Sequence, residues 1–253
     1  MTFAPGETSK TITVCVNGDY LDEPNETFEV NLGTPTGPAV VPPGTKSVVT
    51  IIDDDRNGSF SCQATGVRLL GLSSYLSNAV YNPCMDGKGS LLNLGLNALV
   101  TVNATVLGAT TDATPDNALK SKPAVGDEGK GDASVAGVLI ALGGHTITAD
   151  AVKSHAEATC QAPLGGTPKL SASTVLTNVK IDGKPVVLVN GSAYVELDVL
   201  GLVGVKVWIN RTIVGPTDVT QRGIQVTGAG LLSAVDVVVA EARAGYTGNP
   251  CTS

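Results

Sequence analysis

The chain has 253 residues and a formal net charge of −7 at pH 7, with 23 acidic residues against 16 lysines and arginines. It has no basic stripe that could displace counterions from phosphates, which excludes a nucleic-acid partner, and no run of about 18 apolar residues, which excludes a membrane-spanning helix. Its 30 glycines, 14 prolines and aromatic content of 4% predict an all-β fold of many strands joined by turns, divided between two domains.

Residues 1–56 are predicted to form a small acidic module. Apolar and polar residues alternate at 11–16 and 27–32, and a β-branched run fills 46–52, so we expect three strands. The last strand ends in three consecutive carboxylates, Asp53, Asp54 and Asp55. Neighbouring side chains on a strand point to opposite faces, so these acids can converge only where the chain leaves its strand.

The order of motifs in this module is PGE, then DxxxExNExF, then TIxDDD. In this order the motifs resemble the second half of a Calx-beta domain, a Greek-key β-sandwich of sodium/calcium exchangers and extracellular adhesion proteins. The resemblance covers about residues 3–55, whereas a complete domain is nearly twice as long. A half-sandwich leaves an apolar face and a sheet edge uncovered. We therefore expect the missing strands in a longer parent protein, with another chain or the second domain as the alternative source.

The resemblance also implies a Ca²⁺ site at one end of the sandwich. Asp53, Asp54 and Asp55 match the terminal acidic triple of the family, Asp19 matches one loop acid, and Glu23 occupies a position of the ExNE motif. Ca²⁺ takes six to eight oxygen ligands, and the missing half would supply some of them. The acids either bind Ca²⁺ or form a solvated remnant of the site, and we favour the remnant.

Five cysteines occur without CxxC spacing or a neighbouring histidine, which argues against zinc. Cys62 and Cys160 each begin the tripeptide CQA, and Cys84 and Cys251 each end the tripeptide NPC. This internal echo predicts two disulfides, Cys62–Cys84 and Cys160–Cys251. The alternative is a set of buried free thiols in a cytoplasmic protein. Cys15 is left over and is expected to be a small core residue inside a strand.

Residues 57–253 are predicted to form a larger antiparallel β-sandwich-like domain. Alternating or β-branched runs predict its strands at 94–107, 133–142, 146–160, 174–181, 186–189, 193–200, 205–210, 223–227 and 231–244. Gly-Gly, Asp-Gly and Asn-Gly pairs between several of these runs predict tight hairpins. Residues 110–132 are almost devoid of apolar side chains, which predicts a mobile surface loop that carries Asp127, Glu128 and Asp132 as solvated charges.

Four stretches of this second part are TITADAVKSHAEATC, TVLTNVKIDGKPV, VKVWINR and VDVVVAEARAG. With these stretches, residues 59–247 resemble the bacterial choice-of-anchor P domain, which implies an exported protein with a cell-surface anchor and no known catalytic motif. The first residues lack the basic and apolar regions of a signal peptide, and the final TGNPCTS is neither a sorting signal nor a membrane tail. The chain is either cytoplasmic or a piece of a longer exported protein, and the resemblances favour an extracellular or cell-surface location.

Candidate catalytic groups are few. Ser154 and His155 are adjacent and so fall on opposite strand faces, where they cannot form a nucleophile–base pair. Glu196 and Asp198 share a face about 7 Å apart, a spacing that suits glycoside hydrolysis but is more common on the solvent side of a strand. Trp208 shares a face with polar neighbours and could stack on a sugar or a partner, although a Trp that covers a sheet edge or lies under the long loop is commoner.

These observations predict a non-catalytic, exported surface protein for adhesion, presentation or matrix contact. Its expected partners are other surface or matrix proteins or glycans, and its candidate cofactor is Ca²⁺. Two alternatives stay open. One is a carbohydrate-binding module or polysaccharide-acting enzyme that uses Trp208 with Glu196 and Asp198, and the other is a calcium-regulated binding module.

Overall fold

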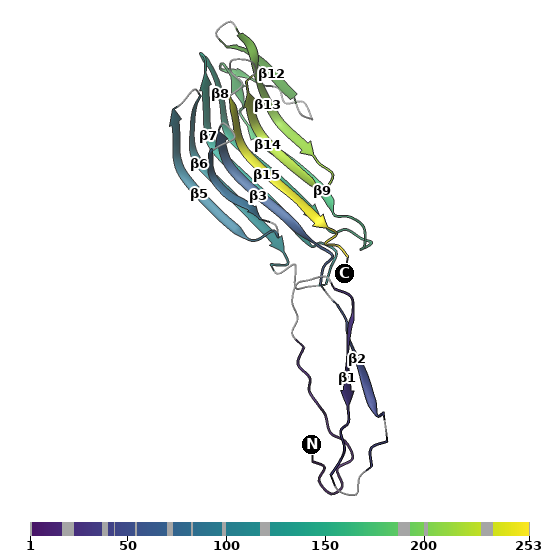
Figure 1. Ribbon diagram of the computed structural model, residues 1–253. Coiled ribbons are helices and arrows are strands. Elements are labelled where there is room, and N and C mark those ends of the chain that lie inside the picture. The colour runs from purple at the N-terminus through teal and green to yellow at the C-terminus, as the bar shows by residue number, and fades with distance from the viewer. Residues whose placement is uncertain are drawn as a thin grey trace.

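The computed structural model describes residues 2–16, 23–36, 40–42, 44–53, 55–69, 73–81, 83–97, 100–116, 122–186, 193–199, 202–228 and 235–252. The described secondary structure consists of strands that pair antiparallel, so the predicted all-β class is confirmed. A two-stranded N-terminal sheet extends from one end of a larger pair of sheets (Figure 1).

One layer of the larger domain is a six-stranded sheet with the order β12-β13-β14-β15-β3-β4. Its strands are β3 (Gly58–Leu69), β4 (Ser73–Tyr81), β12 (Ala193–Val199), β13 (Leu202–Val214), β14 (Asp218–Thr227) and β15 (Asp236–Gly248). The last strand, β15, pairs with the first, β3, along most of their lengths. This pairing joins the two ends of the domain in the middle of one sheet.

The other layer is a seven-stranded sheet with the order β11-β10-β8-β7-β6-β5, in which β9 also pairs with β8. Its strands are β5 (Gly87–Asn97), β6 (Thr101–Thr114), β7 (Glu128–Leu142), β8 (His145–Thr159), β9 (Lys169–Thr177), β10 (Lys180–Ile181) and β11 (Lys184–Pro185). Buried and less buried residues alternate along β6, β7 and β8 because one face of this sheet packs against the other layer. The result is a β-sandwich.

Three predicted features of this domain were wrong. Residues 94–107 are not one strand, because β5 ends at Asn97 and pairs with β6 from Thr101. The chain reverses direction between β5 and β6, but the apolar residues still face the core. Cross-strand partners such as Leu94 and Ala104 share a face, and both are buried. Residues 110–132 are not one loop either, since β6 continues to Thr114 and β7 begins at Glu128. The third error is the single strand predicted at 174–181, because β9 ends at Thr177 and β10 begins at Lys180, with a positive φ at Asn178 between them.

Glycine explains the second error. Every second residue at the start of β7 is small and faces the other layer, beginning with Gly129 and Gly131. A Cβ atom at Gly131 would lie 2.2 Å from the backbone oxygen of Gln63 on the facing strand β3. The inward positions therefore lack apolar side chains because the two sheets approach too closely for them, and not because the segment is a loop.

The core of the sandwich has two parts. The larger contains Val, Leu and Ile side chains from both sheets, such as Val67, Leu107, Ile140 and Ile224. The smaller lies at the end of the sandwich near the N-terminal sheet and is built mainly from alanines, Phe60, Tyr246 and the four bridged cysteines. Disulfides thus reinforce the part of the core where large apolar side chains are scarce.

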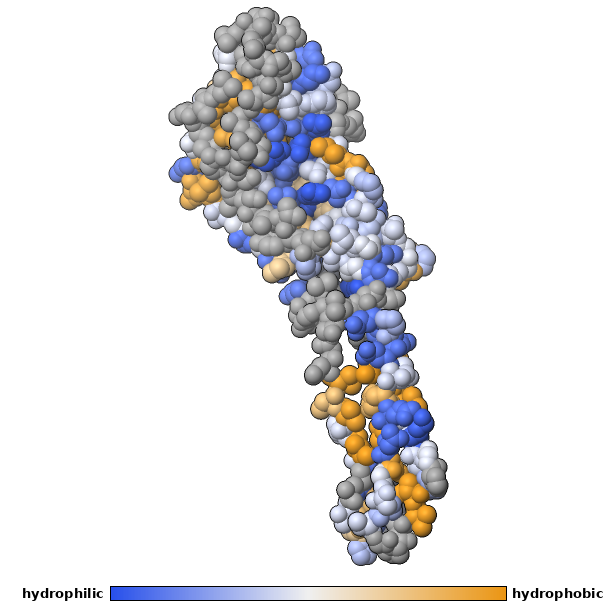
Figure 2. Space-filling model, in the orientation of Figure 1, coloured by the Kyte–Doolittle hydropathy of each residue, from blue (hydrophilic) through white to orange (hydrophobic). Residues whose placement is uncertain are grey.

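The N-terminal sheet pairs β1 (Glu26–Asn31) with β2 (Lys46–Ile51). The strand predicted at 11–16 is absent, because described residues of that segment have no sheet partner, and Cys15 is exposed instead of buried. Apolar side chains gather on the surface of this part of the molecule (Figure 2), including Ile12, Val14, Val48 and Ile52. Exposed apolar side chains in this small module are what the resemblance to half a sandwich implies.

Candidate functional site

The acidic residues proposed for Ca²⁺ are only partly placed. Asp19 and Asp54 lie outside the described residues. The backbone N–H of Asp53 donates to Asn25 Oδ1 over 2.8 Å, and the N–H of Asp55 donates to Asp53 Oδ1 over 3.4 Å. Pairing of β1 with β2 thus brings the ExNE motif beside the acidic triple.

Asp53, Asp55 and Glu23 do not by themselves make a Ca²⁺ site. Across the described ranges, no group of three or more His, Cys, Asp or Glu side chains is arranged to hold a metal ion. Ca²⁺ needs six to eight oxygens, so a site here requires ligands beyond these three acids.

The junction between the two modules is fixed by a buried ion pair. Arg56 Nη2 lies 2.5 Å from Asp127 Oδ2, and the two side chains are 1% and 9% exposed. The same guanidinium donates to the carbonyls of Pro250 (3.0 Å) and Lys122 (3.2 Å). Asp127, predicted to be a solvated loop acid, is therefore a buried partner of Arg56, and the residue that follows the acidic triple is anchored in the sandwich.

The two disulfides, Cys62–Cys84 and Cys160–Cys251, are the pairs that the repeated tripeptides predicted. Cys160 follows β8 in one sheet, and Cys251 follows β15 in the other, so this bridge joins the two layers. A backbone hydrogen bond from Asn57 N–H to the carbonyl of Thr252 (3.0 Å) brings the C-terminal residues to the same end. The first and the last residues of the sandwich are therefore held together at the end near the N-terminal sheet.

Trp208 is packed against its neighbours on the outer face of the six-stranded sheet. The Tyr194 ring centroid lies 4.7 Å from that of Trp208, and the Arg211 guanidinium carbon lies 4.4 Å from the indole centroid. The indole Nε1–H donates to Thr227 Oγ1 over 3.4 Å. These contacts favour the supporting role for Trp208 over an open platform for a sugar.

The other candidate pairs are separated or engaged. Ser154 is buried between the sheets, whereas His155 faces outward, as their adjacency predicted. Glu196 Oε1 lies 3.5 Å from Lys206 Nζ across the strand pair. Asp198 belongs to β12, but its side chain lies outside the described part of the structure. The carboxylate pair considered for glycoside hydrolysis therefore has one member in an ion pair.

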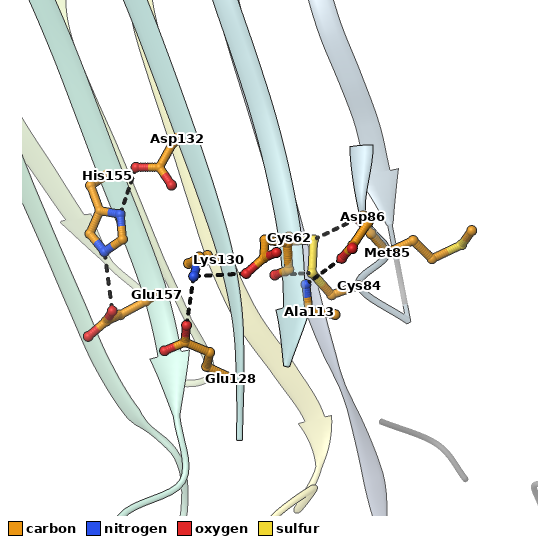
Figure 3. A network of polar contacts seen from close by, with 11 residues as sticks. Cys62, Cys84, Met85, Asp86, Ala113, Glu128, Lys130, Asp132, His155 and Glu157 are labelled. Carbon is orange, nitrogen blue, oxygen red and sulfur yellow. Dashed lines mark hydrogen bonds and ion pairs between the residues drawn. A yellow bond between two sulfur atoms is a disulfide. The ribbon is translucent and has the colours of Figure 1, made fainter. Parts of the chain in front are cut away.

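A polar network that sequence reasoning missed lies on the outer face of the seven-stranded sheet, on β6, β7 and β8 (Figure 3). Lys130 Nζ lies 2.8 Å from Asp112 and 2.9 Å from Glu128, and these two carboxylates raise the pKa of Lys130. His155 lies 2.8 Å from Asp132 through Nδ1 and 3.2 Å from Glu157 through Nε2. The residues belong to β6, β7 and β8, and strand register places them side by side.

The pKa of His155 is raised, chiefly because Asp132 accepts a hydrogen bond from the ring, with Glu157 adding to the effect. A carboxylate at each ring nitrogen favours the doubly protonated imidazolium, which has no free lone pair to accept a proton. His155 is therefore poorly suited to act as a general base. The signal for this network was the alternation of Glu128, Lys130 and Asp132 with glycines, which is a strand pattern with one charged face.

Residues 1–55 match the Calx-beta domain family. No curated protein and no solved structure matches the chain. None of these comparisons identifies the C-terminal domain, so the resemblance of residues 59–247 to the choice-of-anchor P domain rests on sequence motifs alone. No helix in the described ranges is long and apolar enough to cross a membrane.

Proposed function

We propose that this chain is a non-catalytic extracellular protein that contacts surface or matrix components through its β-sandwich. The observation that carries the proposal is the combination of a Calx-beta segment with a sandwich closed by two disulfides. Calx-beta domains are typically extracellular, and disulfides persist in oxidising compartments. Adhesion, presentation or matrix contact is the role that such a rigid, exported module fits.

The anchored junction supports this role. The ion pair between Arg56 and Asp127 holds the end of the Calx-beta segment against the sandwich. A force applied to the N-terminal segment would therefore reach a domain end that is reinforced by both disulfides. The resemblance to the choice-of-anchor P domain adds the expectation of a cell-surface anchor elsewhere in the parent protein.

A non-catalytic role agrees with the chemistry of the described side chains. His155 is held between two carboxylates, and Ser154 lies on the opposite face of its strand. Glu196 is paired with Lys206. The polar groups that do converge form ion pairs suited to binding rather than a nucleophile activated by a base.

The experiment is a binding panel with the full chain immobilised on a biosensor. Purified matrix proteins and polysaccharides are passed over it to measure binding. Each component is also incubated with the protein for a prolonged time, and its molecular mass is then measured. Saturable binding of at least one component, recovered at unchanged mass, is expected. Cleavage of a bound component, or no binding to any of them, would overturn the proposal. Peptide mapping without reductant tests the location, because free thiols at Cys62 and Cys84 would contradict an oxidising compartment.

A second candidate function is Ca²⁺ binding by the N-terminal segment, which the Calx-beta match favours because such domains commonly bind this ion. Calorimetric titration of the full chain with Ca²⁺ tests it. Binding should disappear in an Asp53→Asn/Asp55→Asn variant. It should persist in a Glu7→Gln/Glu29→Gln control, which removes the same charge from the same module. No heat of binding in the unmutated chain would rule this function out.

A further inference from the structure

A trough of about 450 Å³ crosses the outer face of the seven-stranded sheet, from β5 to β9. Its floor is a row of small residues in register, in which Ser90 pairs with Gly108 and Gly108 pairs with Ser134. A Cβ atom at Gly108 would lie 2.7 Å from Ser134 Oγ. The floor is therefore low because a glycine stands at its centre, between two serines.

The borders of the trough differ in character. One border is the polar row Lys88, Thr110, Asp132 and His155, which is continuous with the network of ion pairs described above. Val106 lies on the opposite side, and on β8 and β9 the floor row continues into Lys153 and Val175. Val106 and Val175 are 44% and 63% exposed, so the trough presents aliphatic surface as well as polar groups.

Two lysines in the trough have no carboxylate partner among the described residues, unlike the neighbouring cations. Lys130 and His155 each contact two carboxylates. Lys88 and Lys153 are exposed, and neither forms an ion pair with any residue that the structure describes. Two unpaired cations in one hollow of a protein with a net charge of −7 provide charge complementarity to an anionic ligand.

The orientation of the trough favours a sugar chain over a peptide. The trough runs across five strands, a span of about 19 Å at roughly 4.8 Å per strand spacing. A peptide bound by strand addition would instead run along a sheet edge, and the backbone groups of β6, β7 and β8 are already used in the ladders. Sugar rings combine hydroxyl rims with C–H faces, which match the serines of the floor and the aliphatic border.

We propose that this trough binds an acidic polysaccharide segment, whose carboxylate or sulfate groups contact Lys88 and Lys153. The described lining residues include no Phe, Tyr or Trp ring, so charge and hydroxyl contacts carry the recognition. The inference rests on the proposed extracellular function and names the ligand class and the binding face for it.

The test is calorimetric titration of the full chain with four probes: a tetragalacturonate, a heparin-derived tetrasaccharide, neutral cellotetraose and a polyglutamate peptide. Saturable binding of one or both acidic sugars is expected, and the arm that binds identifies carboxylate or sulfate as the anionic group. Binding of cellotetraose with equal affinity, or of polyglutamate alone, would overturn the proposal. So would the absence of binding to both acidic sugars.

Variants place the ligand in the trough. Lys88→Gln and Lys153→Gln should each weaken binding about tenfold, because each removes a charge-assisted hydrogen bond. Ser134→Phe, which fills the floor, should abolish binding without loss of the folded state. Lys180→Gln on β10, outside the trough, is the matched control and should leave affinity unchanged. Equal effects of Lys180→Gln and Lys153→Gln on affinity would refute this location. If the trough variants still bind matrix components with unchanged affinity, the trough proposal fails but the proposed function stands.

Discussion

Replacement of Arg56 by methionine tests whether the junction is as tightly anchored as the structure shows. The side chain is 1% exposed, and its guanidinium contacts Asp127 Oδ2 at 2.5 Å and two backbone carbonyls at 3.0 and 3.2 Å. Asp127 Oδ2 also accepts the backbone N–H of Ala124 over 2.6 Å. Methionine has a similar length but no charge, so Arg56→Met leaves a buried carboxylate with one partner.

Removal of one member of a buried pair costs about 3–5 kcal/mol, because the other charge remains buried without compensation. For a domain of this size, each kcal/mol shifts the melting temperature by roughly 2–4 °C, so Arg56→Met should lower it by roughly 6–20 °C. Urea unfolding followed by circular dichroism, without reductant, measures the free energy. Asp127→Asn and the double variant complete a double-mutant cycle that isolates the pair.

The control is Arg243→Met, which breaks an ion pair of Arg243 with Asp218 at 2.9 Å on the surface. The Arg243 side chain is 45% exposed, so its loss should cost less than about 1 kcal/mol. A cost for Arg56→Met as small as that of the control would refute the reasoning, since the junction would then not depend on the buried pair.

Three further predictions concern stability. Loss of the Cys160–Cys251 bridge, whose cysteines are 91 residues apart, should cost about 4.6 kcal/mol in urea unfolding, roughly 1 kcal/mol more than loss of the bridge that spans 22 residues; an equal or smaller cost would contradict the loop-entropy argument. The pKa of His155 is raised above its ordinary value of 6.5, so its stabilising effect is complete below pH 6.5 and is lost as the pH rises through the folded-state pKa. In a pH series, the unfolding free energy of the unmutated chain should therefore fall as the pH rises through this range, and His155→Gln should remove that fall. An unchanged pH dependence in the variant would assign it to another group. Gly131→Val should lower the melting temperature, because its Cβ would lie 2.2 Å from the backbone oxygen of Gln63, and overpacking costs about 1–3 kcal/mol; an unchanged melting temperature would show that the sheets can separate there.

The parts of the fold that depend on local pattern were predictable. The Gly143-Gly144 and Asp182-Gly183 pairs form the expected turns, each with positive φ angles. The predicted strand at 146–160 corresponds to β8 (His145–Thr159), because buried and less buried side chains alternate along most of this segment. The hairpin expected at Asn190-Gly191 lies outside the described residues. Alternation and turn chemistry are properties of a few neighbouring residues, so they can be read without knowledge of the tertiary contacts.

The errors arose where packing replaced the local pattern. The glycines of β7 hid a strand because close approach of the two sheets excludes larger side chains there. Cys15 was expected in a core, but within the described residues no second sheet covers the N-terminal segment, so Cys15 is exposed. In both cases the deciding neighbour is distant in the sequence or absent from the described chain.

The amino-acid sequence by itself determined the all-β class, the Calx-beta character of residues 1–55 and the pairing of the cysteines. Alternation along a strand also indicates which residues share a face. Only the tertiary structure decided which residues of different strands become neighbours. Cross-strand register brings Ser90, Gly108 and Ser134 into one row, and the fold brings Arg56 to Asp127. The physical reason is that a shift of one residue in register turns a strand's other face toward its neighbours, and register is fixed by the packing of both sheets.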